Sequence, residues 1–63
     1  MEKHKLKLLR NSMLWRNGKM YDIEIWQCQE CKKYLIIDVK KASRLNLNGL
    51  LGEEIEDGKG CYD

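Results

Sequence analysis

Two cysteines three positions apart, Cys28 and Cys31, constrain the fold of this chain more than any other sequence feature. They lie between two apolar-rich runs, residues 23–27 before them and residues 34–37 after them. Short alternating or β-branched runs of this kind predict strands. Thiols at this spacing can hold one metal ion, or they can form a redox pair. The sequence therefore predicts a strand, a tight turn that carries the thiols, and a second strand.

The length of the chain makes a cross-link important. A domain of 63 residues buries only about 60% of the surface of its unfolded chain, so its stability is marginal without one. Three cysteines cannot all pair in intramolecular disulfides, and a metal ion is the favoured alternative. We expect a single zinc-stapled domain over residues 1–63, with residues 53–63 as an acidic, partly flexible tail.

Two further patterns predict the strands that precede the thiols. Residues 5–8 alternate between Lys and Leu, and residues 21–25 alternate between apolar and acidic side chains. Asn17-Gly18 lies between these runs and is typical of a two-residue type I′ hairpin turn, because both residues accept a positive φ. Together with residues 34–39, these runs predict a three-stranded antiparallel β-meander.

Residues 40–51 fit two predictions. Their spacing is compatible with a short helix that ends at Gly52. In contrast, Leu45 and Leu47 follow a period-two alternation that leads up to Asn48-Gly49, and this combination is a second hairpin signal. The helix is the favoured interpretation. The expected fold class is therefore small α+β, a three-stranded antiparallel β-meander with a zinc knuckle and a short C-terminal helix, and the alternative is an all-β fold.

Four side chains form the donor set of a closed tetrahedral Cys₃His zinc site: His4, Cys28, Cys31 and Cys61. A two-residue turn at 17–18 without a bulge would place His4 opposite Cys31 and Lys7 opposite Cys28, with Cβ atoms about 4.5–5.5 Å apart. A bulge would move His4 to the other face of the sheet. A helix over residues 40–51 would run back toward the thiols and leave enough chain for Cys61 to reach them. The sequence thus predicts one structural Zn²⁺ per chain.

Alternatives to this metal site remain open. If His4 or Cys61 is not a ligand, two chains could share one ion through Cys28 and Cys31, so that monomer and homodimer are both possible. A redox role is disfavoured because a redox C-x-x-C normally opens a helix, whereas strands are predicted on both sides here. The sequence lacks a Ser-His-Asp set and a phosphate-binding glycine loop, and a non-enzymatic protein is expected.

The chain is expected to be cytoplasmic and not bound to a membrane. No apolar run approaches the roughly 20 residues that span a bilayer, and residues 1–5 lead into an alternating stretch and not a continuous apolar one.

The net charge of +2 conceals a basic body and an acidic end. Residues 1–44 contain eleven Lys and Arg against five acids, a net +6, and residues 45–63 contain one Lys against five acids, a net −4. This division is compatible with a polyanionic partner, although solvated surfaces explain it equally well. We expect nucleic acid, DNA or RNA, to bind a basic β-sheet face through Lys5, Lys7, Arg10, Trp15, Arg16, Lys19, Lys32 and Lys33. The alternative is a protein-binding regulator or inhibitor that docks through its acidic tail, residues 53–57.

Two local resemblances accompany these patterns. Residues 23–32 resemble one knuckle of a zinc ribbon and are similar to the second knuckle of the small zinc-ribbon translational activators encoded by transposable phages. This resemblance covers about fifteen residues and implies zinc binding and, through that family, RNA binding. The second C-x-x-C of a zinc ribbon is missing from this chain.

Residues 15–20 resemble the W-R-x-G-K-M hairpin of the seven-kilodalton archaeal chromatin proteins, which lay a three-stranded sheet across the DNA minor groove. The resemblance implies DNA contacts by Trp15 and by Met20, the latter as part of an intercalating wedge. It covers six residues, Asn17 stands where that family has an apolar wedge residue, and the family lacks the thiol pair.

Overall fold

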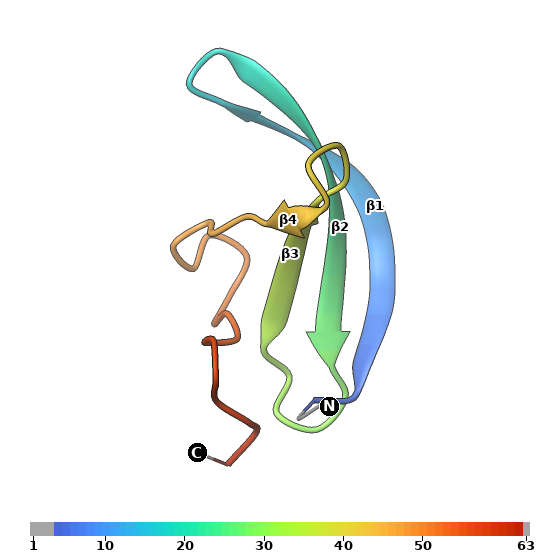
Figure 1. Ribbon diagram of the computed structural model, residues 1–63, viewed down its shortest axis with the longest axis vertical. Helices are drawn as coiled ribbons and strands as arrows, with labels where there is room; N and C mark the ends of the chain where they lie inside the picture. The colour runs from blue at the N-terminus through green and yellow to red at the C-terminus, as the bar shows by residue number, and fades with distance from the viewer. Residues whose placement is uncertain (1–3, 63) are drawn as a thin grey trace.

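Four antiparallel strands form one sheet in the computed structural model, which describes residues 4–62. The strands are β1 (Leu6–Arg16), β2 (Lys19–Cys28), β3 (Tyr34–Asp38) and β4 (Ser43–Arg44). Their order in the sheet is their order in the chain, so each strand pairs with the next one (Figure 1). The predicted three-stranded meander is therefore present, and a short fourth strand extends it.

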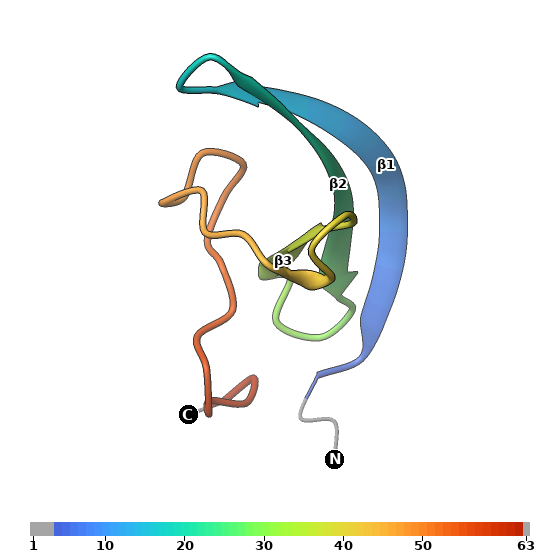
Figure 2. The ribbon, with the colours of Figure 1, turned by 45° about the horizontal axis from the view of Figure 1, so that its top comes forward.

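The turn between β1 and β2 has the predicted type I′ conformation. Asn17 and Gly18 have φ values of 52° and 76°, and Arg16 pairs with Lys19 across them. Type I′ turns match the right-handed twist of the strands that they join. The two strands consequently continue to the tip as one curved ribbon, which arches over the C-terminal part of the chain (Figure 2).

A β-bulge interrupts the pairing of β1 with β2. Leu8 pairs with Trp26 and Arg10 with Ile25, which leaves Leu9 as an extra residue in β1. A bulge of this kind bends the strand and increases its twist.

Because of this bulge, the predicted register at the N-terminal end of β1 is wrong. Leu6, and not Lys7, pairs with Cys28. His4 lies in a bend before the first residue of β1, so the predicted direct pairing of His4 with Cys31 is wrong. The sequence contains no signal for a bulge at Leu8–Arg10, because every residue in this stretch fits a regular strand.

The core lies on one side of the sheet, here called the inner face. Ile23, Ile25 and Ile36 form it together with Leu47, which reaches the sheet from the segment after β4. The partly buried side chains around them are Leu14, Tyr21, Tyr34 and Leu45. Successive side chains of a strand point to opposite sides, so the residues that alternate with these lie on the opposite, outer face.

Residues 40–51 form no helix, and the predicted α+β class with a short C-terminal helix is wrong; the described chain is all-β. The buried Asp38 carboxylate accepts hydrogen bonds from the backbone N–H groups of Lys40 (3.1 Å) and Lys41 (3.3 Å). This side chain stabilises a turn in place of the first turn of a helix. Ala42 then has a φ of 52°, a left-handed conformation that an α-helix does not contain.

The second turn signal, Asn48-Gly49, forms a turn but not a hairpin. Both residues have positive φ, 53° and 79°, and the N–H group of Leu50 donates to the carbonyl of Leu47 (3.1 Å). Within residues 4–62, no strands pair on the two sides of this turn. The turn instead directs the chain back toward the thiol end of the sheet.

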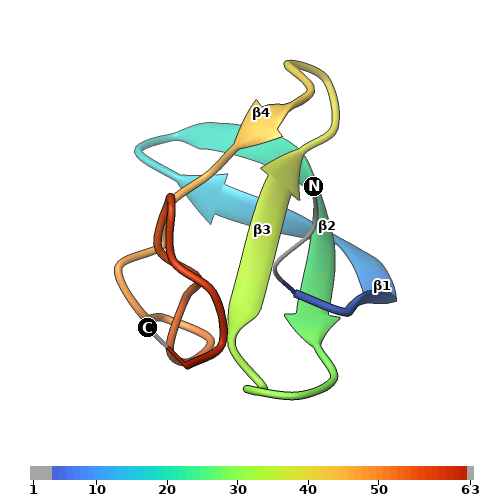
Figure 3. The ribbon, with the colours of Figure 1, turned by 60° about the horizontal axis from the view of Figure 1, so that its bottom comes forward.

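The C-terminal segment returns beside β3 (Figure 3). The N–H group of Tyr34 donates to the carbonyl of Glu53 (2.8 Å), and the N–H group of Ile55 donates to the carbonyl of Tyr34 (2.9 Å). Ile55 is buried, and the Arg44 guanidinium donates to its carbonyl oxygen. These contacts fix the path that leads to Cys61. The described part of the chain has no helix of the length and apolarity needed to cross a membrane.

Candidate metal centre

Four metal-ligating side chains from three separate parts of the chain lie together at one end of the sheet. His4 precedes β1, Cys28 is the last residue of β2, Cys31 lies in the turn after it, and Cys61 lies in a turn near the C-terminus. One ligand atom from each of them lies within 4.8 Å of all the others. The structure thus brings together the four side chains that the sequence predicts as ligands.

The distances within this cluster suit a single ion. The Sγ atoms of Cys28 and Cys61 are 3.3 Å apart, and Nδ1 of His4 is 3.3 Å from Sγ of Cys61 and 3.5 Å from Sγ of Cys31. Zn–S bonds of 2.3 Å and Zn–N bonds of 2.0–2.1 Å in a tetrahedron separate the ligand atoms by about 3.5–3.8 Å. An ion at the centre therefore requires shifts of only a few tenths of an ångström at these three contacts.

The turn after β2 holds Cys28 through the main chain. Its N–H group donates to the carbonyl of Lys33 and its carbonyl accepts from Lys32, both at 3.0 Å. Its buried Sγ atom accepts from the N–H groups of Glu30 (3.4 Å) and Cys31 (3.5 Å). Lys32 has a φ of 65°, which lets the chain turn sharply into β3. The short C-x-x-C spacing produces this arrangement, in which the N–H groups of Glu30 and Cys31 point at the Sγ atom of Cys28.

A backbone carbonyl orients the imidazole of His4. Its Nε2 atom lies 2.9 Å from the carbonyl oxygen of Lys59. That oxygen can only accept, so Nε2 carries a proton, and Nδ1 is the nitrogen that faces the thiols. Metal-binding histidines commonly donate their second N–H to such an acceptor. Sequence analysis missed the role of Lys59, because a main-chain acceptor leaves no signal in residue type.

The surroundings shift the pKa values of three of these groups. Burial would raise the pKa of Cys28, but the N–H groups of Cys31 and Glu30, together with the side chains of His4 and Cys61, lower it to about 5. Burial, followed by the contacts with the thiols of Cys28 and Cys31, raises the pKa of Cys61 to about 12. The hydrogen bond with Cys28, followed by the one with Lys59, raises the pKa of His4. At neutral pH the cluster therefore combines a Cys28 thiolate with a protonated Cys61 thiol.

Four protein donors are a complete tetrahedral ligand set, as in a zinc-knuckle-like module. Such a set leaves no coordination position for a substrate, which is the arrangement of structural metal sites. Comparisons with protein-family models, with curated proteins and with solved structures found no match to this chain. The four donors of the cluster could bind a metal ion, and the function proposed below is argued from their chemistry.

Three of the basic residues predicted to bind nucleic acid lie near this cluster. Lys5 precedes β1 and is 3.4 Å from a carboxylate oxygen of Glu30. Lys32 and Lys33 lie between the thiol turn and β3, and Lys33 is 3.9 Å from Glu53. Two of these three cations thus have a carboxylate beside them.

The other five predicted residues lie on β1 and β2 and do not share one face. Trp15 is on the outer face, opposite Met20, and 67% of its surface is exposed. Arg10 is paired with the buried Ile25 and belongs to the inner side. By alternation, Lys7, Arg16 and Lys19 lie on that side too. Nucleic-acid binding stays a prediction.

Proposed function

We propose that this chain is a small non-enzymatic module whose fold is held together by one Zn²⁺ ion. His4, Cys28, Cys31 and Cys61 bind the ion. The observation that carries the proposal is the convergence of these four donors, with the proton of His4 placed on Nε2 by Lys59 and Nδ1 left for the metal. Binding of nucleic acid or of a regulatory protein remains a prediction beyond it.

The donor set favours zinc among the common metals. Three thiols and one imidazole are the soft and borderline ligands that Zn²⁺ takes in tetrahedral structural sites. Ca²⁺ and Mg²⁺ take oxygen ligands instead. The proposal therefore includes discrimination between Zn²⁺ and the abundant hard cations.

The positions of the thiols support a structural role over a redox role. Cys28 ends a strand and Cys31 lies in a turn that leads into another strand. Neither thiol is at the N-terminus of a helix, the position that usually activates a redox C-x-x-C. A bound ion would connect the start of β1, the β2–β3 turn and the C-terminal segment.

Native mass spectrometry of the reduced chain, loaded with Zn²⁺ and then desalted, tests the proposal. We expect one zinc per chain in a monomer, and a Co²⁺-loaded sample should show the absorption of a tetrahedral thiolate site. His4→Ala and Cys61→Ser should each weaken zinc binding at least about tenfold, since each removes one of four ligands. Lys5→Ala is the matched control for His4→Ala and should bind zinc as the unmodified chain does.

Two results would contradict the proposal. One is a chain that remains metal-free in an excess of Zn²⁺. The other is one ion shared by two chains and unaffected by His4→Ala and Cys61→Ser, which would leave Cys28 and Cys31 as the only ligands from each chain.

A further inference from the structure

The first strand leaves one long edge of the sheet unpaired. β1 has eleven residues and is the terminal strand of the sheet, whereas β4 at the other end has two. Within residues 4–62, no segment pairs with the second edge of β1 (Figure 1). Its residues 7–11 are all exposed. An uncovered edge of this length is a template for the addition of another strand.

The type I′ turn determines which backbone groups are available at this edge. Residues that face each other in an antiparallel pair are alternately hydrogen-bonded and not hydrogen-bonded to the partner strand. Arg16 and Lys19 flank the two-residue turn and form the first, hydrogen-bonded pair. Counting back from them, Trp15, Met13 and Asn11 direct their N–H and C=O groups away from β2. The bulge at Leu9 ends this regular stretch, so Arg10 to Arg16 is the segment that can accept a strand.

The outer face of this segment is apolar. Met13 and Trp15 are 64% and 67% exposed, and Met20, opposite Trp15, is 44% exposed. Two carboxylates flank these side chains, since Asp22 pairs with Met13 and Glu24 with Asn11.

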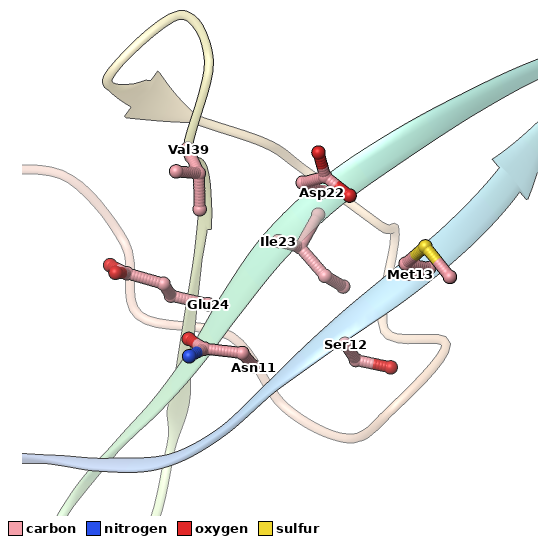
Figure 4. Close-up of a pocket in the computed structure, with 7 residues that line it drawn as sticks. All are labelled: Asn11, Ser12, Met13, Asp22, Ile23, Glu24 and Val39. Carbon is pink, nitrogen blue, oxygen red and sulfur yellow. The ribbon is translucent and has the colours of Figure 1, made fainter.

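Figure 4 shows a hollow at this place. Asn11 and Glu24 point to one side of the β1–β2 ribbon, and Ser12 and Ile23 point to the other. Asp22 lies 3.8 Å from the ammonium group of Lys40, so a ligand on the outer face would meet apolar surface next to charges of both signs.

The other face of the same segment is basic. Arg10 and Arg16 lie on it, Lys7 lies on the same side before the bulge, and β1 contains no acidic residue. Within residues 4–62, neither Lys7 nor Arg10 forms an ion pair, and Arg16 donates to the carbonyl of Asn46 (2.8 Å).

The acidic residues of the C-terminal segment do not neutralise this face. Up to residue 62, each of them has a partner elsewhere: Glu53 with Lys33, Glu54 with the N–H groups of Leu47 and Gly49, Glu56 with Lys59 and Asp57 with Arg44. The positive charge of β1 is therefore available to an external carboxylate.

A second copy of this chain does not suit the edge in the antiparallel register that pairs all of residues 10–16. Antiparallel self-pairing centred on Met13 would place Arg10 opposite Arg16 of the other copy at both ends. Like charges directly opposite each other destabilise a strand pair. Charge complementarity requires an acidic partner instead.

We infer that the free edge of β1, residues 10–16, binds an extended acidic segment of another protein as an added strand. The partner's backbone would pair with Asn11, Met13 and Trp15. Alternate side chains of the partner would be apolar, against Met13 and Trp15, and the side chains between them would include carboxylates near Arg10 and Arg16. This inference is independent of the metal centre.

A blocked peptide of sequence Glu-Val-Thr-Val-Thr-Val-Glu tests the inference against the zinc-loaded chain. Its pattern reads the same in both directions, so it fits parallel and antiparallel addition. We expect ¹⁵N amide resonances of Asn11, Met13 and Trp15 to shift on titration and their hydrogen exchange to slow. The matched peptide Lys-Val-Thr-Val-Thr-Val-Lys should bind at least about tenfold more weakly. A single-stranded oligonucleotide is titrated in parallel.

Two variants distinguish strand addition from a general charge effect. Arg10→Glu should reverse the preference between the two peptides. Asn11→Pro removes an N–H group that points away from β2 and should abolish binding with the fold intact, whereas Asn11→Ala should bind normally. Equal binding of both peptides by the unmodified chain, shifts confined to other strands, or binding of the oligonucleotide but not the acidic peptide would each overturn the inference. If Asn11→Pro fails to fold, the Arg10→Glu result still decides.

Discussion

In the proposed metal centre, protons compete with Zn²⁺ at the individual ligands, and Cys61 shows this most clearly. Its pKa is raised to about 12 by burial and by the neighbouring thiols, and the pKa of His4 is raised by its contact with Cys28. Zn²⁺ must displace these protons, so its affinity falls as the pH falls. For each proton displaced, we expect the apparent dissociation constant of Zn²⁺ to increase about tenfold when the pH is lowered by one unit.

Chelator-competition titrations between about pH 6 and about pH 8 measure this dependence. Calorimetry in two buffers of different ionisation enthalpy counts the protons released. Cys28, with a pKa of about 5, is already a thiolate over this range and should contribute little to the count. Lys5→Ala should show the slope of the unmodified chain, and a dissociation constant that does not change with pH would contradict the prediction.

Gly52 is a second residue with a measurable role. Its φ is +151°, and a Cβ atom there would lie 2.7 Å from Cε2 of Tyr34 and 3.0 Å from its Cδ2. Gly52→Ala should lower the free energy of unfolding by about 3 kcal/mol, through backbone strain and overlap with a packed ring. Gly58→Ala is the control, because φ there is +78° and an added Cβ atom would meet nothing within 4 Å besides its chain neighbours; it should cost about 1 kcal/mol. Urea unfolding of the two zinc-loaded variants measures the difference, and equal losses would show that the Tyr34 ring yields.

Residue type alone predicted the four side chains of the cluster, but not the contacts that hold them in place. His4 and the three cysteines are the only imidazole and thiols in the chain, so the donor set followed from a count. The supporting contact from Lys59 is a main-chain carbonyl that the fold brings to His4 from 55 positions away. Long-range contacts of this kind depend on the path of the C-terminal segment, which local patterns do not determine.

At the scale of elements, one carboxylate connects the turn at 48–49 to the segment beside β3. Glu54 accepts hydrogen bonds from the N–H groups of Leu47 (3.1 Å) and Gly49 (2.9 Å). Glu54→Ala leaves these groups without their acceptor and should lower the free energy of unfolding by about 1–3 kcal/mol. Glu56→Ala removes only an exposed ion pair with Lys59 and should cost less than about 0.5 kcal/mol. Equal losses in the two variants, measured by thermal or urea unfolding, would refute this role for Glu54.

The elements differed in how far their sequence determined them. The β1–β2 hairpin was predictable because Asn17-Gly18 requires positive φ at both positions and period-two runs flank it. The helix over 40–51 was mispredicted because the spacing of its apolar residues does not report two local features that prevent a helix. These are the Asp38 carboxylate, which stabilises a turn, and the left-handed residues at 42 and 48. Extended pairing beside Ile36 then buries Leu47 without a helix. The bulge at Leu9 was unpredictable because regular and bulged strands have the same residue preferences here.

For the whole molecule, the proposed metal centre brings together parts of the chain that are far apart in sequence. An ion there would join residues separated by 27, 33 and 57 positions, whereas the core of Ile23, Ile25 and Ile36 depends mainly on strands that are neighbours in sequence. Closing such long loops through one ion removes conformational entropy from the unfolded chain, as a disulfide does. The ion should therefore contribute more to stability than any single side chain.

Metal removal tests this expectation. A single core in a domain of this size supplies about 3–5 kcal/mol, and a ligand present at a thousandfold excess over its dissociation constant adds about 4 kcal/mol. Chelation by EDTA under reducing conditions should consequently abolish the cooperative thermal transition or lower its midpoint by at least about 15 °C, because 1 kcal/mol corresponds to about 4–8 °C in a small domain. Circular dichroism should show recovery with Zn²⁺ but not with Mg²⁺, which does not replace thiolate-bound zinc. If the melting temperature is the same with and without EDTA, the sheet is stable on its own contacts and the ion is not its cross-link. In Cys61→Ser, the same treatment should have a smaller effect, because the connection to the C-terminal segment is already lost.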